Sequence, residues 1–84
     1  MEMADRLQNA VVGTKQVLKA LEAGTLGRVY IALDTEPHIQ NRLQAVCEQH
    51  GMAVETVSTM RELGALCGIE VGAACAGVRE PPPK

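Results

Sequence analysis

The sequence predicts an α/β fold, a three-layer α/β/α sandwich with a mixed sheet of about four strands. Two observations carry this prediction. Short, nearly continuous apolar segments alternate along the chain with amphipathic segments of helical period. The chain has 84 residues, of which 46% are hydrophobic, so it can bury one core but not two. We therefore expect a single domain over residues 1–78 and a disordered, proline-rich tail over residues 79–84.

The elements follow from this pattern in order. We expect helix 2–9, strand 10–12, helix 14–23, strand 28–33, a helix from Pro37 to about His50, strand 52–57, a short helix from Met60 to Cys67 and strand 71–78. Gly24 and Gly51 stand where the two longer helices end. Thr59 and Glu62 have capping-box spacing at the start of the short helix. The last strand consists of small residues, which let helices approach closely and suit a central place in the sheet.

A polar segment follows the strand predicted at 28–33. Asp34 and Thr35 come directly after it and precede Pro37. An acid at the carboxyl end of a buried strand can be catalytic, but Asp and Thr before a proline also begin many helices. We favour capping of the next helix, because no base, nucleophile and orienting group occur together in a motif.

Composition excludes several classes of function. The formal net charge is −2, whereas proteins that coat nucleic acid indiscriminately are strongly basic. Tyr30 is the only aromatic residue, so stacking of bases on aromatic rings is nearly excluded. The three cysteines, Cys47, Cys67 and Cys75, lack CxxC spacing and indicate buried thiols in a reducing cytoplasm. We expect no metal, no cofactor, no membrane span and no targeting peptide.

The first candidate binding segment begins at Gly13, which with Thr14 leads into a helix. On a helical wheel Lys15, Gln16 and Lys19 share one arc, while apolar residues occupy the opposite arc. Two cations and an amide beside the N–H groups of a helix start suit a polyanion or the polar edge of a base. Two lysines four residues apart are also common on a merely solvated helix face, and this alternative stays open.

Two motifs together resemble a known family. Residues 13–19 read GTKQVLK, residues 63–73 read LGALCGIEVGA, and an α/β pattern separates them. Their order and separation resemble the kink-turn-binding family of large-subunit ribosomal proteins, the L7Ae and L30e type, and most closely its short bacterial members. The resemblance covers the chain from about Asp5 to Val78. It implies an α/β/α sandwich that binds RNA at a sharp bend with tandem sheared G·A pairs and an extruded nucleotide.

The resemblance also implies roles for residues of the first motif. Gly13 and Thr14 would shape the helix start, and Lys15, Gln16 and Lys19 would face the G·A pairs and nearby phosphates. These roles agree with their chemistry, because lysines and helix termini serve phosphate and an amide can pair with a base edge.

The second motif would supply the loop on which the extruded base rests. Ile69, Glu70 and Val71 would form this loop, and Gly68 would give it backbone freedom. An aliphatic loop can cover an unstacked base without an aromatic ring. The alternative is ordinary burial of Ile69 and Val71 at the mouth of the last strand, with Glu70 in a solvated turn.

We therefore expect a non-catalytic RNA-binding protein that recognises and stabilises a kink-turn in structured RNA, ribosome-associated, cytoplasmic and monomeric. The alternative is a protein-interaction module of the same fold that has lost RNA binding. A third class, less favoured, is a small enzyme that uses Asp34 or Cys67.

Overall fold

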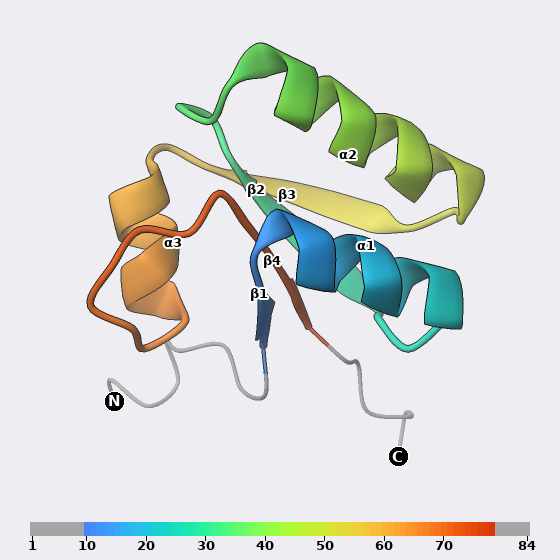
Figure 1. Ribbon diagram of the computed structural model, residues 1–84, viewed down its shortest axis with the longest axis horizontal. Helices are drawn as coiled ribbons and strands as arrows, with labels where there is room; N and C mark the ends of the chain where they lie inside the picture. The colour runs from blue at the N-terminus through green and yellow to red at the C-terminus, as the bar shows by residue number, and fades with distance from the viewer. Residues whose placement is uncertain (1–9, 79–84) are drawn as a thin grey trace.

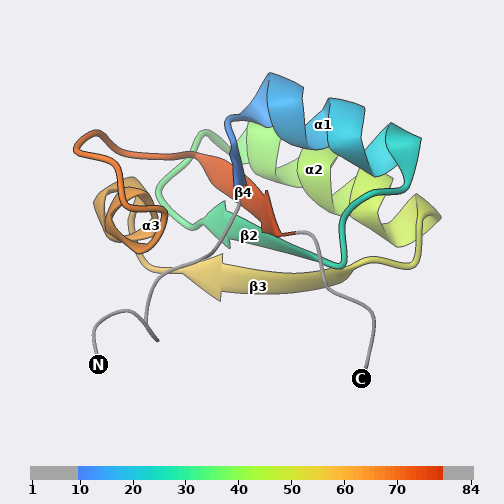
Figure 2. The same ribbon diagram turned by 90° about the horizontal axis from the view of Figure 1, so that it is seen from below.

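The computed structural model describes residues 10–78, which form a mixed four-stranded sheet with three helices (Figure 1). In chain order the elements are β1 (Val11–Val12), α1 (Thr14–Ala23), β2 (Arg28–Ala32), α2 (Pro37–Gln49), β3 (Ala53–Val57), α3 (Met60–Leu66) and β4 (Cys75–Val78). Helices α1 and α2 cover one face of the sheet (Figure 2), and α3 packs on the other. The predicted three-layer sandwich is confirmed. The helix predicted at 2–9 and the tail predicted at 79–84 lie outside the described residues.

The strand order β1-β4-β2-β3 brings several chain connections to one edge of the sheet. β2 pairs with β3 in parallel, and β4 runs antiparallel to both β1 and β2. The carboxyl ends of β1, β2 and β3 therefore lie beside the amino end of β4. We call this side of the molecule the carboxyl edge. The start of α1, the β2–α2 loop and the α3–β4 loop all lie there.

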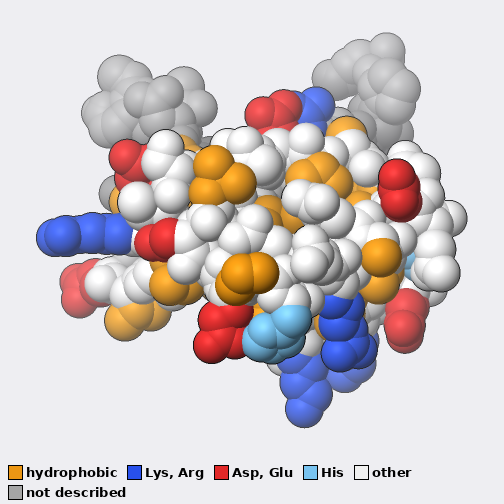
Figure 3. Space-filling view, turned by 90° about the horizontal axis from the view of Figure 1, so that it is seen from above, with side chains coloured by type: hydrophobic (Ala, Val, Ile, Leu, Met, Phe, Trp, Pro, Cys, Tyr) orange, Lys and Arg blue, Asp and Glu red, His pale blue; other side chains and the backbone are white. Residues whose placement is uncertain are grey.

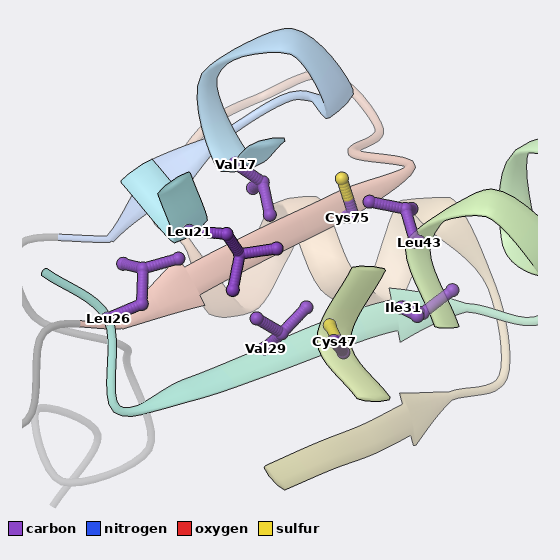
Figure 4. Packing of buried hydrophobic residues seen from close by; sticks show 8 residues of the cluster. All are labelled: Val17, Leu21, Leu26, Val29, Ile31, Leu43, Cys47 and Cys75. Atoms are coloured by element: carbon purple, nitrogen blue, oxygen red, sulfur yellow. The ribbon is translucent and has the colours of Figure 1, made fainter. Parts of the chain in front are cut away.

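The larger part of the core lies between the sheet and the helices α1 and α2. Its buried members are Val17, Leu21, Leu26, Val29, Ile31, Leu43, Cys47 and Cys75 (Figure 4). On the other face, Leu63 of α3 packs with three buried alanines. Along β2, Val29 and Ile31 belong to the first cluster, whereas Ala32 belongs to the second. The continuous apolar sequence of this strand thus reflects burial on both faces.

The last strand is shorter than the sequence predicts, because the segment before it packs on α3 and Ala73 is hydrogen-bonded to that helix. A strand is predicted from Val71, but β4 begins at Cys75. The Ala73 N–H donates to the Met60 carbonyl of α3 at 2.9 Å. The other described elements begin and end within one residue of the prediction, and the predicted central place of the last strand, between β1 and β2, is confirmed.

The three cysteines carry free thiols, and two of them are buried in the larger core. Burial raises the pKa of the Cys47 and Cys67 thiols. It raises the pKa of the Cys75 thiol to about 11, although the Thr14 hydroxyl, which can donate a hydrogen bond to the thiolate, acts in the opposite direction. At neutral pH these thiols therefore behave as the small hydrophobic groups that the sequence predicts.

The raised pKa of Cys75 predicts a loss of stability at alkaline pH. A thiol in the unfolded chain ionises near pH 9, whereas the buried thiol stays protonated until about pH 11. Between these values the unfolded chain binds fewer protons than the folded chain, so the free energy of unfolding falls as pH rises. Cys75 contributes a fall of about 2 kcal/mol over this range and none below about pH 8. Urea denaturation of the reduced protein from pH 7 to pH 11 measures this effect.

The Cys75→Ala variant is the control for this experiment. Its free energy of unfolding should fall less steeply between about pH 9 and pH 11 than that of the wild type, whatever packing energy it loses at neutral pH. Equal slopes for the two proteins would contradict the assignment.

Candidate nucleic-acid interface

Three segments that are far apart in the sequence meet at the carboxyl edge. The Gly13 N–H donates to the Cys75 carbonyl at 3.1 Å, which ties the start of α1 to β4. The Ala32 N–H donates to the Ala74 carbonyl at 2.9 Å, which ties the end of β2 to the residue before β4. The α3–β4 loop leads directly into these two acceptors. The structure therefore brings both sequence motifs to the same edge.

The start of α1 presents a positive surface to solvent. Gly13 precedes the helix with φ of 102°, a backbone conformation that favours glycine. Within residues 10–78 no side chain caps this helix, and its first turn holds no acid. Lys15, Gln16 and Lys19 are exposed, while Val17 is buried. The predicted division of the helix into two faces is confirmed, and Lys15 lies in the first turn, where the helix dipole is also positive.

Thr14 supports this helix start from inside. Its side chain is half-buried, and its hydroxyl accepts a hydrogen bond from the Cys75 thiol at 3.7 Å. Thr14 is thus linked to β4 through a side chain, while Gly13 is linked to the same residue through the backbone.

The α3–β4 loop exposes aliphatic side chains. Gly68 turns the chain out of α3 with φ of 78°. Ile69 and Val71 are 36% and 68% exposed, and Glu70 between them is exposed as well. Burial of Ile69 and Val71, the alternative that the sequence left open, is therefore wrong. Exposed aliphatic groups beside one acid suit the uncharged face of a base better than they suit a phosphate.

Close backbone packing holds this loop against α3. A Cβ atom at Gly64 of α3 would overlap the Val71 carbonyl oxygen. A Cβ atom at Gly72 would lie 3.2 Å from the Cβ of Met60. The hydrogen bond from the Ala73 N–H to the Met60 carbonyl fixes the same contact. Since the loop backbone is fixed in this way, its exposed side chains project from a defined position.

The β2–α2 loop ties the interface to α3 and β4. The Asp34 carboxylate accepts a hydrogen bond from the Met60 N–H at 2.8 Å, at the start of α3. Thr35 is 5% exposed, and its hydroxyl donates to the Ala74 carbonyl at 3.3 Å. The prediction that these two residues cap the next helix is wrong. The residue that precedes α2 is Glu36, whose side chain makes no capping hydrogen bond, and Asp34 caps α3 instead.

Sequence reasoning misses three exposed side chains at this edge. Leu33, directly after β2, is 52% exposed. Glu36 and His38 are exposed, with 3.4 Å between the Glu36 Oε1 and the His38 Nε2 atoms. A leucine followed by acids beyond a buried strand was the available signal, because loops at the carboxyl ends of such strands gather at binding sites.

Charge is unevenly distributed over the surface. In the view of Figure 3, several Lys and Arg side chains lie together at the lower margin, on the side of α1 and α2, and others lie singly at the left and upper margins, while Asp and Glu side chains are scattered. A local positive surface thus coexists with the net charge of −2. Among residues 10–78, no three His, Cys, Asp or Glu side chains lie close enough to hold a metal ion. No helix in this range is long and apolar enough to cross a membrane.

Comparison with known proteins identifies the family. The chain matches the Ribosomal protein L7Ae/L30e/S12e/Gadd45 family over residues 1–82. It belongs to this family. An RNA-binding protein of Caldanaerobacter subterraneus subsp. tengcongensis is 47% identical over 66 residues, which cover 79% of this chain and 80% of the relative. An RNA-binding protein of Halalkalibacterium halodurans is 38% identical over 79 residues, which cover 94% of this chain and 96% of the relative.

A ribosomal protein and a solved structure extend the comparison. The large ribosomal subunit protein eL8 of Nitrosopumilus maritimus is 37% identical over 67 residues, which cover 79% of this chain and 52% of that protein. The 15.5kD RNA binding protein of Giardia lamblia has a TM-score of 0.81 at 26% identity, over 89% of this chain and 63% of that one. The family resemblance stated from the two motifs is confirmed. The roles of individual site residues stay predictions.

Replacing Gly64 tests how the α3–β4 loop is held. A change from glycine to alanine inside a helix ordinarily stabilises a protein by up to about 1 kcal/mol. For Gly64→Ala we expect a loss of about 1–3 kcal/mol, because the added Cβ overlaps the Val71 carbonyl and displaces the loop. Urea denaturation measures the loss, and NMR chemical shifts of Ile69 and Val71 report the displacement.

The reverse change at the neighbouring position is the matched control. Ala65 is exposed, so Ala65→Gly should cost about 1 kcal/mol of helix propensity and leave the loop shifts unchanged. A Gly64→Ala protein that is more stable than the wild type would refute the close contact.

Proposed function

We propose that this protein binds RNA at a kink-turn, a sharp bend with sheared G·A pairs and an extruded nucleotide, and stabilises the bend. One observation carries the proposal: the uncapped, lysine-bearing start of α1 and the exposed aliphatic α3–β4 loop lie at the same edge. Family membership and relatives named as RNA-binding proteins support RNA as the ligand. The family and these names indicate a binding protein and not an enzyme.

The start of α1 is the surface suited to the G·A pairs and their phosphates. Its exposed N–H groups and the ammonium groups of Lys15 and Lys19 attract phosphate oxygens. The Gln16 amide carries both donors and an acceptor, so it can pair with the polar edge of a base. Gly13 and Thr14 set the direction in which this surface points, because both are hydrogen-bonded to β4.

The α3–β4 loop is the surface suited to the extruded nucleotide. Ile69 and Val71 offer aliphatic contact to a base that has left its stack, and Glu70 offers an acceptor to the N–H groups of a base. Gly68 allows the chain to turn from α3 into this loop. In a bend of this kind an unstacked base lies near paired bases. The two protein surfaces likewise lie near each other, at one edge of the sheet.

Few contacts are needed for this mode of binding, and this agrees with the net charge of −2. Each phosphate contact on duplex changes the slope of log affinity against log salt concentration by only about 0.9. The salt dependence of binding should therefore be shallow. One relative is a large ribosomal subunit protein. We accordingly propose ribosomal RNA, bound by a monomer in the cytoplasm, as the natural setting.

Titration into labelled RNA tests the function. We expect a kink-turn RNA to bind at least about tenfold more tightly than a straight duplex of equal length, because only the bend presents both surfaces with a partner. Replacing the G·A pairs by Watson–Crick pairs should remove the difference. Equal or absent binding to all three RNAs would contradict the proposal and favour a protein-interaction module of the same fold.

The Lys15→Ala variant tests the role of the α1 surface. We expect binding to the kink-turn RNA to weaken by about 1–3 kcal/mol, the usual scale of a specific contact to nucleic acid. Lys84→Ala removes the same charge at the end of the chain and should bind like the wild type. If Lys15→Ala also binds like the wild type, Lys15 has no place in the interface.

A further inference from the structure

A shallow groove of about 260 Å³ runs along α1, on the flank of the helix that faces β1. It is lined by Val11, Gln16, Lys19, Ala20, Ala23 and Thr25. Two of these residues, Gln16 and Lys19, already belong to the candidate interface. The groove therefore continues that interface from the start of α1 toward the end of the helix.

Small side chains keep the groove open along the helix. Gln16, Ala20 and Ala23 follow one another at i, i+4 and i+7 and so share one flank. The helix rises about 10 Å between Gln16 and Ala23, at about 1.5 Å per residue. This length accommodates a short segment of a nucleic-acid backbone.

The charges around the groove favour a polyanion. Lys19 lies on its rim, and none of the lining residues within 10–78 is acidic. The acid of α1, Glu22, does not line the groove, but it follows Lys19 at i+3 and lies about 60° from it around the helix. Of the described residues that line the groove, only Lys19 is charged.

The uncharged atoms of the groove match the chemistry of a ribose. The Thr25 hydroxyl donates its proton to the Ala20 carbonyl at 3.2 Å, so its lone pairs can accept a hydrogen bond from a 2′-hydroxyl. Val11 and Ala20 are partly buried beneath it and offer an aliphatic floor to the C–H surface of the sugar.

We infer that this groove binds the ribose–phosphate backbone of the RNA stem that adjoins the bend. Lys19 contacts a phosphate of that strand, and Thr25 contacts a 2′-hydroxyl. This inference rests on the proposed function and extends it from the bend to the stem. Affinity then depends on the length of the stem and on its sugar, two properties that recognition of the bend alone does not require.

Filling the groove tests the inference. Ala23→Leu puts a larger side chain into the groove and keeps a good helix former. We expect this variant to bind a kink-turn RNA with full stems about tenfold more weakly than the wild type does. For an RNA whose stems are trimmed to the minimum that keeps the bend, the two proteins should agree within about twofold. Ala45→Leu makes the same change at an exposed alanine of α2 and is the matched control.

Charge and sugar provide independent readouts. Ala23→Lys should tighten binding to the full-stem RNA and steepen its salt dependence by about one unit of slope. Ala45→Lys should change the affinity and the salt dependence less. Replacing ribose by deoxyribose in the stem should weaken binding by the wild type. The same replacement should change the affinity of Ala23→Leu little.

The outcomes separate this inference from the proposed function. Equal affinities of Ala23→Leu and Ala45→Leu for the full-stem RNA would overturn the groove assignment and leave recognition of the bend intact. A wild-type protein with no preference for the bend over a straight duplex would overturn both.

Discussion

The two peptide units at the start of β4 are the point on which the structure of the carboxyl edge depends. The Ala74 carbonyl accepts hydrogen bonds from the Ala32 N–H and the Thr35 hydroxyl, and the Cys75 carbonyl accepts one from the Gly13 N–H. A buried backbone group that lost its partner would cost about 1–3 kcal/mol. The start of α1, the end of β2 and the α3–β4 loop are therefore fixed relative to one another. The loops that form this surface are therefore held in place by the sheet.

Glycines allow close packing of the α3–β4 loop and of β4. Gly64 and Gly72 let the α3–β4 loop lie directly on α3. Gly77 of β4 leaves room for Leu26, whose side chain would overlap a Cβ atom at that position. The small residues of the last strand thus allow close packing on both faces of the sheet. Because the loop backbone is pressed against α3, its aliphatic side chains remain available at the surface.

The helices and the exposed arc of α1 could be predicted from sequence because helical periodicity depends only on near neighbours in the chain. Contacts between residues that are distant in sequence could not be predicted in this way. Asp34 has the local sequence of a residue that caps the following helix, yet it caps α3, 26 residues further along. Residues 71–74 have the composition of a strand, but hydrogen bonding and glycine packing on α3 override that preference. Such contacts follow from the strand order, which periodicity does not specify.

The candidate site shows the same division. Spacing placed Lys15, Gln16 and Lys19 on one face but could not distinguish a binding surface from a solvated one. The family resemblance favours a binding surface, and it also drew attention to Ile69 and to Val71, whose exposure the strand predicted at 71–78 concealed. Leu33, Glu36 and His38 were missed because only the strand order brings their loop to the carboxyl edge.

An acidic chain can bind RNA selectively because charges act over a limited distance, about 10 Å at 0.1 M salt. Lys15 lies at the positive end of α1 and Lys19 one turn further along, whereas Glu36 and Glu70 lie in the other two segments of the edge. A straight duplex carries phosphates along its whole surface and would bring some of them toward these acids. A bend that turns a base toward the α3–β4 loop brings an uncharged surface there instead. Selectivity against a straight duplex then depends on where the charges lie more than on the net charge.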